Sequence, residues 1–81
     1  MEITLDQLEK EQIARVSGFS AEHEGLVARL REVGFAEGDE VEFLYHGPLG
    51  RTPLCFRLNR TLIALRAAEA RVVQVSLDVE A

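Results

Sequence analysis

In the second half of the chain, hydrophobic residues recur at every second position. They do so in four short runs, at Val41–Tyr45, Leu54–Leu58, Leu62–Ala64 and Val73–Val75. Turn-forming residues separate these runs, at Gly38–Asp39, Gly47–Gly50 and Asn59–Arg60. A period of two is typical of half-buried strands. The pattern therefore predicts a mainly β fold, a small antiparallel barrel with few open sheet edges.

One segment has the spacing of a helix instead. Four of its apolar residues fall on one helical face, at Leu26, Val27, Leu30 and Val33. Ser20 stands where a helix N-cap would, and Gly34 follows the last apolar position as a natural helix end. These signals predict one inserted α-helix, over about residues 21–33. Ahead of it, Gln12–Ser17 is predicted to be a strand.

Length and composition are those of one small domain, which we place at residues 1–81. The chain has 81 residues, of which 47% are hydrophobic and 28% are charged. These values are ordinary for soluble globular proteins and argue against intrinsic disorder. No run approaches the roughly 18 apolar residues of a membrane span, so we expect no direct membrane insertion. The acidic, interrupted N-terminus does not resemble a signal peptide, and the expected location is cytoplasmic.

Charge is divided unevenly along the chain. Residues 1–42 hold eleven acidic and four basic side chains, a formal charge of −7. Residues 43–81 hold three acidic and five basic side chains, a formal charge of +2. The net charge of −5 argues against a nucleic-acid-binding protein, because phosphate contacts supply most of that affinity. The basic residues of the second half are all arginines and could form a partner-facing edge or solvated strand ends.

No arrangement of side chains in the sequence points to catalysis. Cys55 lies between apolar strand residues, and nothing places it or a serine beside His23 or His46. Adjacent residues on a helix point in different directions, so the run Glu22-His23-Glu24 cannot chelate one ion. We therefore predict no enzyme, no catalytic residue, no cofactor and no metal site. Whether His23 or His46 binds a metal stays open.

The segment 46–53 contains two glycines and two prolines and is predicted to be a stiff loop. Leu49 at its centre is an apolar side chain on an expected surface loop. It either contacts a partner or folds back to cap the barrel. Tyr45, just before the loop, is either a packing residue at a strand end or part of the same contact surface.

Five sequence motifs, taken in order, suggest a family. They are RLREVGF (29–35), GDEV (38–41), PLG (48–50), TLIALRAAEA (61–70) and VVQV (72–75), with VSGFS (16–20) ahead of the helix. In this order they resemble the ferrous iron transport protein A family, over about residues 5–77. The resemblance implies a five-stranded SH3-like antiparallel barrel with one inserted helix.

The resemblance also implies a role. Members of this family are small cytosolic accessories of the ferrous iron transporter, a membrane protein with a cytosolic GTP-binding domain. The implied partner is the cytosolic part of that transporter, which would recruit the chain to the inner face of the membrane. We predict no nucleic-acid partner, and the sequence leaves self-association open without predicting it.

The partner-binding residues expected on this basis are Tyr45, Pro48, Leu49, Gly50, Arg51 and Arg66. The chain departs from the family pattern at one place. PLG is commonly followed by an acidic residue and then proline, whereas here Arg51 and Thr52 precede Pro53. The basic tip puts the transfer of the loop's role from the family in doubt.

Two alternatives remain open from the sequence. The first is a stand-alone SH3-like regulatory module, related to the C-terminal domain of metal-dependent repressors of the diphtheria-toxin-regulator type. The second is a small metal carrier or enzyme, which would need His23 or His46. SH3-like barrels serve many unrelated roles, so the fold alone does not choose among them.

Overall fold

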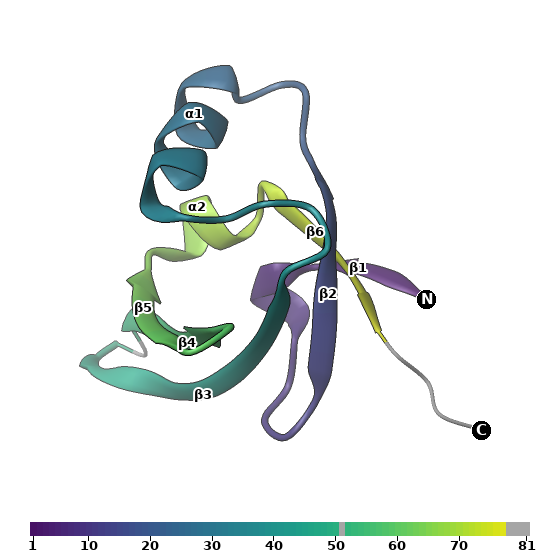
Figure 1. The fold of residues 1–81 in the computed structure, drawn as a ribbon. Helices are drawn as coiled ribbons and strands as arrows, with labels where there is room; N and C mark the ends of the chain where they lie inside the picture. Colours follow the sequence, from purple (N-terminus) through teal and green to yellow (C-terminus); the bar gives the residue numbers. More distant parts are fainter. Residues whose placement is uncertain (51, 78–81) are drawn as a thin grey trace.

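The computed structural model describes residues 1–50 and 52–77, and its strands form one antiparallel sheet (Figure 1). The strands are β1 (Glu2–Thr4), β2 (Ile13–Phe19), β3 (Glu40–Leu49), β4 (Thr52–Leu58), β5 (Thr61–Leu65) and β6 (Val73–Leu77). The helical segments are the 3-10 turn η1 (Leu5–Gln7), α1 (Glu24–Val33) and α2 (Ala67–Ala70). The predicted mainly β fold with an inserted helix between β2 and β3 is confirmed.

The sheet has six strands, in the order β1-β6-β2-β3-β4-β5, rather than the five that were expected. β1 has only three residues, too few to show an alternation in the sequence. It joins the sheet by pairing with β6, with Ile3 opposite Val75. β1 and β5 stand at the two ends of the order and do not pair, so the expected closed barrel is in fact an open, strongly curved sheet (Figure 1).

A single hydrophobic core lies inside the curve of the sheet. Its members are Leu5, Leu8, Ala14, Val16, Leu30, Phe35, Val41, Phe43, Leu54, Phe56, Leu58, Leu65, Ala70, Val72, Val73 and Val75. Alternate residues of each strand point to opposite faces, which is why the predicted runs at 41–43, 54–58 and 73–75 all contribute to the core. The alternation thus predicted the buried face of β4, of β6 and of the start of β3, but not that of β5, where Leu62 is exposed and Leu65 is buried.

Helix α1 begins three residues later than predicted. Its N-cap is His23, and the Ser20 hydroxyl instead accepts a weak hydrogen bond of 3.4 Å from the N–H of Glu22, in the turn before the helix. Gly34 ends the helix as expected, with φ of 128°, a conformation that favours glycine. Its N–H bonds the carbonyls of Leu30 and Arg31 at 3.1 Å. The helix end is therefore fixed by local chemistry, whereas the start is not.

The predicted apolar face of α1 is buried only in part. Leu30 is 1% exposed, and Leu26 and Val27 pack against the core. Val33, in contrast, is 51% exposed, because it is the last residue of the helix. The helix thus covers the core mainly through Leu30.

The expected loop at 46–53 is mostly strand. β3 runs to Leu49 and β4 begins at Thr52, so Gly50 is the one described residue of this segment that lies outside a strand. The pairing of β3 with β4 shifts register twice, between Phe43 and Tyr45 and between His46 and Leu49. These irregularities let the glycine- and proline-containing segment stay in the ladder. The short helix α2, which was not predicted, follows β5 directly.

Candidate partner-binding site

The predicted contact residues of the loop lie at the outer end of the β3–β4 hairpin. Leu49 is 80% exposed and lies opposite Thr52. The Thr52 hydroxyl donates a hydrogen bond of 2.6 Å to the Leu49 carbonyl, and Gly50 takes φ of 63° to make the turn. The turn therefore holds the Leu49 side chain out from the core. Of the two alternatives, the one in which Leu49 caps the barrel is excluded by this exposure.

Gly47 is required by the close approach of the two hairpin strands. A Cβ atom placed on Gly47 would lie 2.3 Å from the Thr52 carbonyl oxygen and 2.6 Å from Cδ of Pro53. Both contacts are far below van der Waals distance, and the first is with backbone. The Thr52–Pro53 peptide bond in this approach is cis. Gly47 thus sets the geometry that presents Pro48 and Leu49.

Tyr45 lies on the exposed face of the same hairpin, directly opposite Cys55. The Tyr45 side chain is 52% exposed. A hydrogen bond with the Cys55 thiol, together with the charge of the ionised thiol and some burial, raises the pKa of Tyr45 above its ordinary value. Cys55 is half-buried, in keeping with its place between apolar strand residues. Tyr45 is therefore a neutral, exposed aromatic residue at neutral pH.

Arg66 directly follows β5, whose last residue, Leu65, pairs with Leu54 near the turn end of β4. Its backbone N–H donates a hydrogen bond of 2.9 Å to the Glu69 carboxylate at the start of α2, and its side chain is exposed. Arg66 and Pro53 line one surface hollow of about 320 Å³, together with Arg29, Leu30, Val33, Ile63, Ala64, Leu65 and Glu69. Arg66 is thus placed at the turn end of the hairpin, beside Pro53, rather than at its base.

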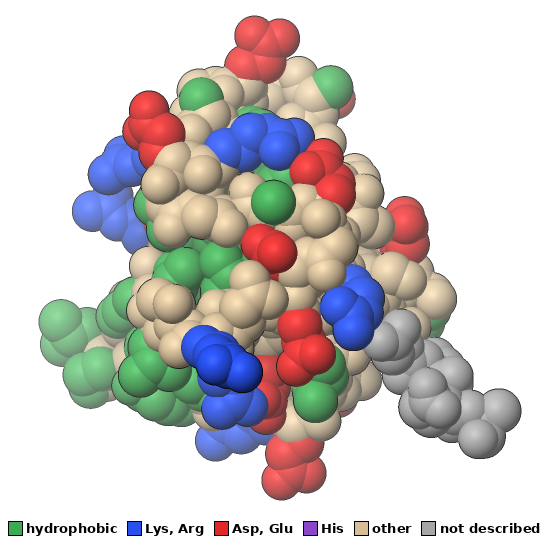
Figure 2. Space-filling model, in the orientation of Figure 1, with side chains coloured by type: hydrophobic (Ala, Val, Ile, Leu, Met, Phe, Trp, Pro, Cys, Tyr) green, Lys and Arg blue, Asp and Glu red, His purple; other side chains and the backbone are tan. Residues whose placement is uncertain are grey.

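The structure brings most of the predicted residues to one region of the surface. Hydrophobic side chains gather at the lower left of Figure 2, where Figure 1 places the β3–β4 hairpin and β5. Exposed Tyr45, Leu49 and Leu62 belong to these elements. Arg51, the predicted basic tip, lies outside the described residues. Leu62, 70% exposed, was missed as a candidate because its alternation with Ile63 suggested ordinary strand packing.

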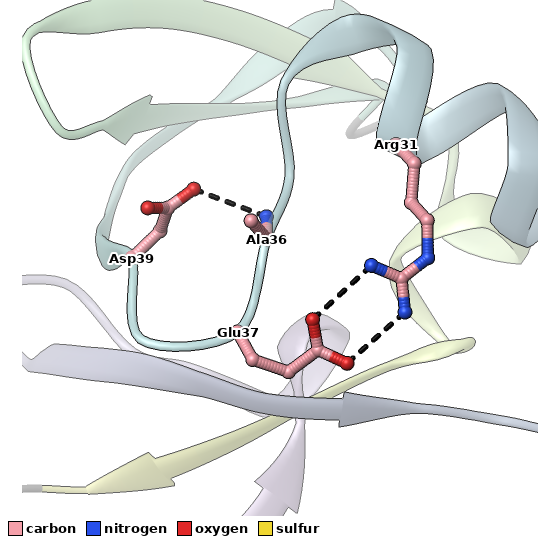
Figure 3. Close-up of polar contacts among 4 residues, drawn as sticks. All are labelled: Arg31, Ala36, Glu37 and Asp39. Atoms are coloured by element: carbon pink, nitrogen blue, oxygen red, sulfur yellow. Dashed lines mark hydrogen bonds and ion pairs between the residues drawn. The ribbon is translucent and has the colours of Figure 1, made fainter.

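A second surface feature was also missed. The guanidinium of Arg31 lies 4.5 Å from the ring centroid of Phe19 and forms a bidentate ion pair with Glu37, which Figure 3 shows. These three residues line a hollow of about 570 Å³ between α1 and β2. Arg31 was not among the site residues expected from the sequence. Its partners come from separate segments, so no local signal pointed to them.

Neither a metal cluster nor a membrane-spanning helix occurs in the described part of the chain. No group of three His, Cys, Asp or Glu side chains there is arranged to hold a metal ion. His46 packs edge-on against Phe43, with ring centroids 4.9 Å apart, and His23 occupies the N-cap position of α1. None of the helices over residues 1–50 and 52–77 is long and apolar enough to cross a membrane.

Comparison with protein families gives one match over most of the chain. The model of the FeoA domain matches residues 3–77. A search of curated proteins finds no match. The family match covers nearly the whole sheet, from β1 to the end of β6.

Solved structures of other proteins share this fold. FeoA from Stenotrophomonas maltophilia is 35% identical, with a TM-score of 0.75, over 94% of this chain and 89% of that one. It was solved with zinc and is described as an SH3 domain protein proposed to be a bacterial ferrous iron transport activating factor. A FeoA-like protein from Clostridium acetobutylicum has a TM-score of 0.85 at 24% identity, over 99% of this chain and 91% of that one. The fold is thus SH3-like.

The same fold occurs as part of a longer chain. T. acidophilum IdeR matches with a TM-score of 0.78 at 16% identity, over 95% of this chain but 34% of that one. At this identity the likeness shows the fold alone.

Proposed function

Because the chain belongs to the FeoA family, we propose that it is an accessory of ferrous iron uptake that acts by binding the cytosolic part of the ferrous iron transporter. The observation that carries this proposal is the family match over residues 3–77. The description of the S. maltophilia relative as a proposed ferrous iron transport activating factor supports it. The chain would then act by binding, and its cytoplasmic place at the inner membrane face would follow from its partner.

We propose the outer end of the β3–β4 hairpin as the contact surface, with Tyr45, Pro48, Leu49, Gly50 and Arg51 at its centre. Leu49 supports this choice because it is 80% exposed on a turn fixed by the Thr52 hydroxyl. An apolar side chain held out by a rigid turn loses little conformational entropy when a partner covers it. Arg66 is included as a charged residue at the rim.

Co-purification with the full-length transporter in mild detergent tests this proposal. Wild type and Leu49→Asp are compared, with and without a non-hydrolysable GTP analogue. Wild type is expected to be retained and Leu49→Asp to be lost, because a carboxylate would be buried without a partner. Ile13→Asp is the matched control, since Ile13 is also an exposed apolar residue, on β2, and is 45% exposed.

Two outcomes would contradict the proposal in different ways. If wild type does not co-purify with the transporter under any nucleotide condition, the transporter is not its partner, and a regulatory module is favoured. Equal retention of Leu49→Asp and wild type would keep the partner and remove the hairpin tip from the contact surface. A thermal melt of each variant shows whether it is folded before either conclusion is drawn.

A further inference from the structure

Strand β5 forms an open edge of the sheet. It pairs with β4 on one side, in regular register from Leu58 opposite Thr61 to Leu54 opposite Leu65, and no described strand pairs with its other side. In an antiparallel pair, hydrogen-bonded and non-bonded positions alternate, so half of the backbone N–H and C=O groups of β5 face away from β4. These groups can accept a further strand.

This edge lacks the features that usually block strand addition. β5 reads Thr-Leu-Ile-Ala-Leu and contains no charge, proline or glycine, and its register with β4 shows no bulge. Leu62 is 70% exposed on it. The opposite edge strand, β1, has only three residues and carries Glu2. Short length and charge are common protections of sheet edges, and β5 has neither.

The charges around β5 distinguish between possible occupants. Arg60 immediately precedes the strand and Arg66 immediately follows it, and neither side chain forms an ion pair within the described part of the chain. Antiparallel pairing of two β5 strands, centred on Ile63, would place Arg60 of each copy opposite Arg66 of the other. Like charges directly opposite each other destabilise a strand pair. Pairing of β5 with a second copy of this chain is therefore disfavoured. A partner strand with acidic residues at its two ends is favoured.

Space is available beside the edge. The hollow of about 320 Å³ is lined by Ile63 and Leu65 of β5 on one side and by Arg29, Leu30 and Val33 of α1 on the other. Alternate side chains of an added strand would enter this hollow, against an apolar floor with Arg29 at its rim. Backbone pairing would supply affinity, and the hollow would select apolar side chains.

We propose that β5 binds an extended segment of a partner protein that has alternating apolar residues and acidic residues at both ends. The segment adds to the sheet as a seventh strand, with its carboxylates beside Arg60 and Arg66. This inference goes beyond the proposed function, because it assigns the open edge of β5 and a binding mode that does not depend on the transporter; Arg66 is the one residue that both proposals use.

A synthetic peptide with a Val-Thr-Val-Thr-Val core and two Glu residues at each end is the probe. Its binding to the full chain is followed by fluorescence anisotropy of a label on the peptide. The same core with Lys ends tests the charges, and a core with a central Pro tests the backbone pairing. The Glu-ended peptide is expected to bind about tenfold more tightly than either control, since each pair of exposed charges contributes modestly.

Variants of the chain locate the binding site. Leu62→Lys and the double variant Arg60→Glu/Arg66→Glu are expected to weaken binding about tenfold or more. Ile13→Lys, and the double variant Lys10→Glu/Arg71→Glu with the same change in net charge, are the matched controls and should bind as wild type does. Backbone amides of β5 should gain hydrogen-exchange protection on peptide binding.

Several outcomes would overturn the proposal. One is equal binding of the Glu-ended and Lys-ended peptides. Another is a loss of peptide binding in the matched control variants as large as in the β5 variants. A third is hydrogen-exchange protection on peptide binding that appears elsewhere in the chain but not in β5. Absence of binding up to millimolar peptide would also overturn it, as would self-association of the free chain through β5. None of these outcomes bears on the transporter experiment, so the two proposals can fail separately.

Discussion

The guanidinium of Arg31 donates two hydrogen bonds to the carboxylate of Glu37, with N–O distances of 3.1 and 3.0 Å (Figure 3). Arg31 lies in the last turn of α1, and Glu37 lies in the connection to β3. Close by, the Asp39 carboxylate accepts a hydrogen bond of 3.0 Å from the N–H of Ala36 (Figure 3). Side chains thus fix the path of the chain between the helix and the sheet.

This ion pair predicts a pH dependence of stability. The hydrogen bonds from Arg31 lower the pKa of Glu37 below its ordinary value of 4.5. A carboxyl group with a lowered pKa in the folded state contributes stability above its unfolded pKa, and loses that contribution as pH falls through the folded pKa. Glu37→Gln is therefore expected to be less stable than wild type at pH 7, with a difference that shrinks below about pH 4.5.

Urea unfolding at several pH values measures this difference. Glu32→Gln is the control, since Glu32 is exposed on the same helix and forms no ion pair within the described residues. If Glu37→Gln changes the free energy of unfolding by the same amount at pH 7 and at pH 3, the ion pair does not contribute to stability.

Leu30 is expected to be the main anchor of α1. Leu30→Ala should lower the free energy of unfolding by about 2–4 kcal/mol, because it removes a fully buried side chain and leaves a cavity. Leu49→Ala should change it by less than about 0.5 kcal/mol, because Leu49 is exposed. Chemical denaturation of the two variants makes the comparison. If the two substitutions lower the free energy of unfolding equally, the packing of α1 on the core does not depend on Leu30.

Two glycines should respond in opposite directions to the same substitution. Gly47→Ala is expected to cost about 1–3 kcal/mol, because its Cβ would overlap the Thr52 backbone. Gly25→Ala should stabilise the protein by up to about 1 kcal/mol, because Gly25 lies in α1 with nothing within 4 Å of the added Cβ. Thermal unfolding of the pair tests both signs. A neutral Gly47→Ala would mean that the hairpin relaxes freely.

The ionisation of Tyr45 should report its contact with Cys55. Cys55→Ala is expected to lower the pKa of Tyr45 toward its ordinary value of 10.0, because the thiol hydrogen bond is the main cause of the raised pKa. Tyr45 is the chain's one tyrosine and there is no tryptophan, so ultraviolet absorbance at alkaline pH follows it directly. An unchanged titration curve in Cys55→Ala would show that the two side chains do not interact.

Much of the fold could be predicted from local patterns. Phe43 and Phe56 were placed in the core from alternation alone, and they pack with ring centroids 5.5 Å apart. Gly34 predicted the end of α1, because only a local left-handed turn is needed there. These features depend on neighbouring residues, and neighbouring residues are what a sequence pattern records.

The remaining features depend on distant contacts. β1 is identified only by its pairing with β6, and β3 continues past Gly47 only because β4 lies beside it. Arg31 meets Phe19 and Glu37 through the way the helix docks, which no spacing reveals. The exposure of Leu49 agrees with a contact role, but the partner-binding residues as a set stay a prediction until the transporter experiment is done.

The pairing of β1 with β6 has a consequence for how the chain folds. Strands β3, β4 and β5 follow one another with short turns, so their contacts close small loops. The contact of Ile3 with Val75, and the hydrogen bond of 2.9 Å from the Leu77 N–H to the Met1 carbonyl, close a loop of almost the full chain. Closing a long loop costs more entropy, so we expect the β3–β5 meander to form early and the two ends to meet last.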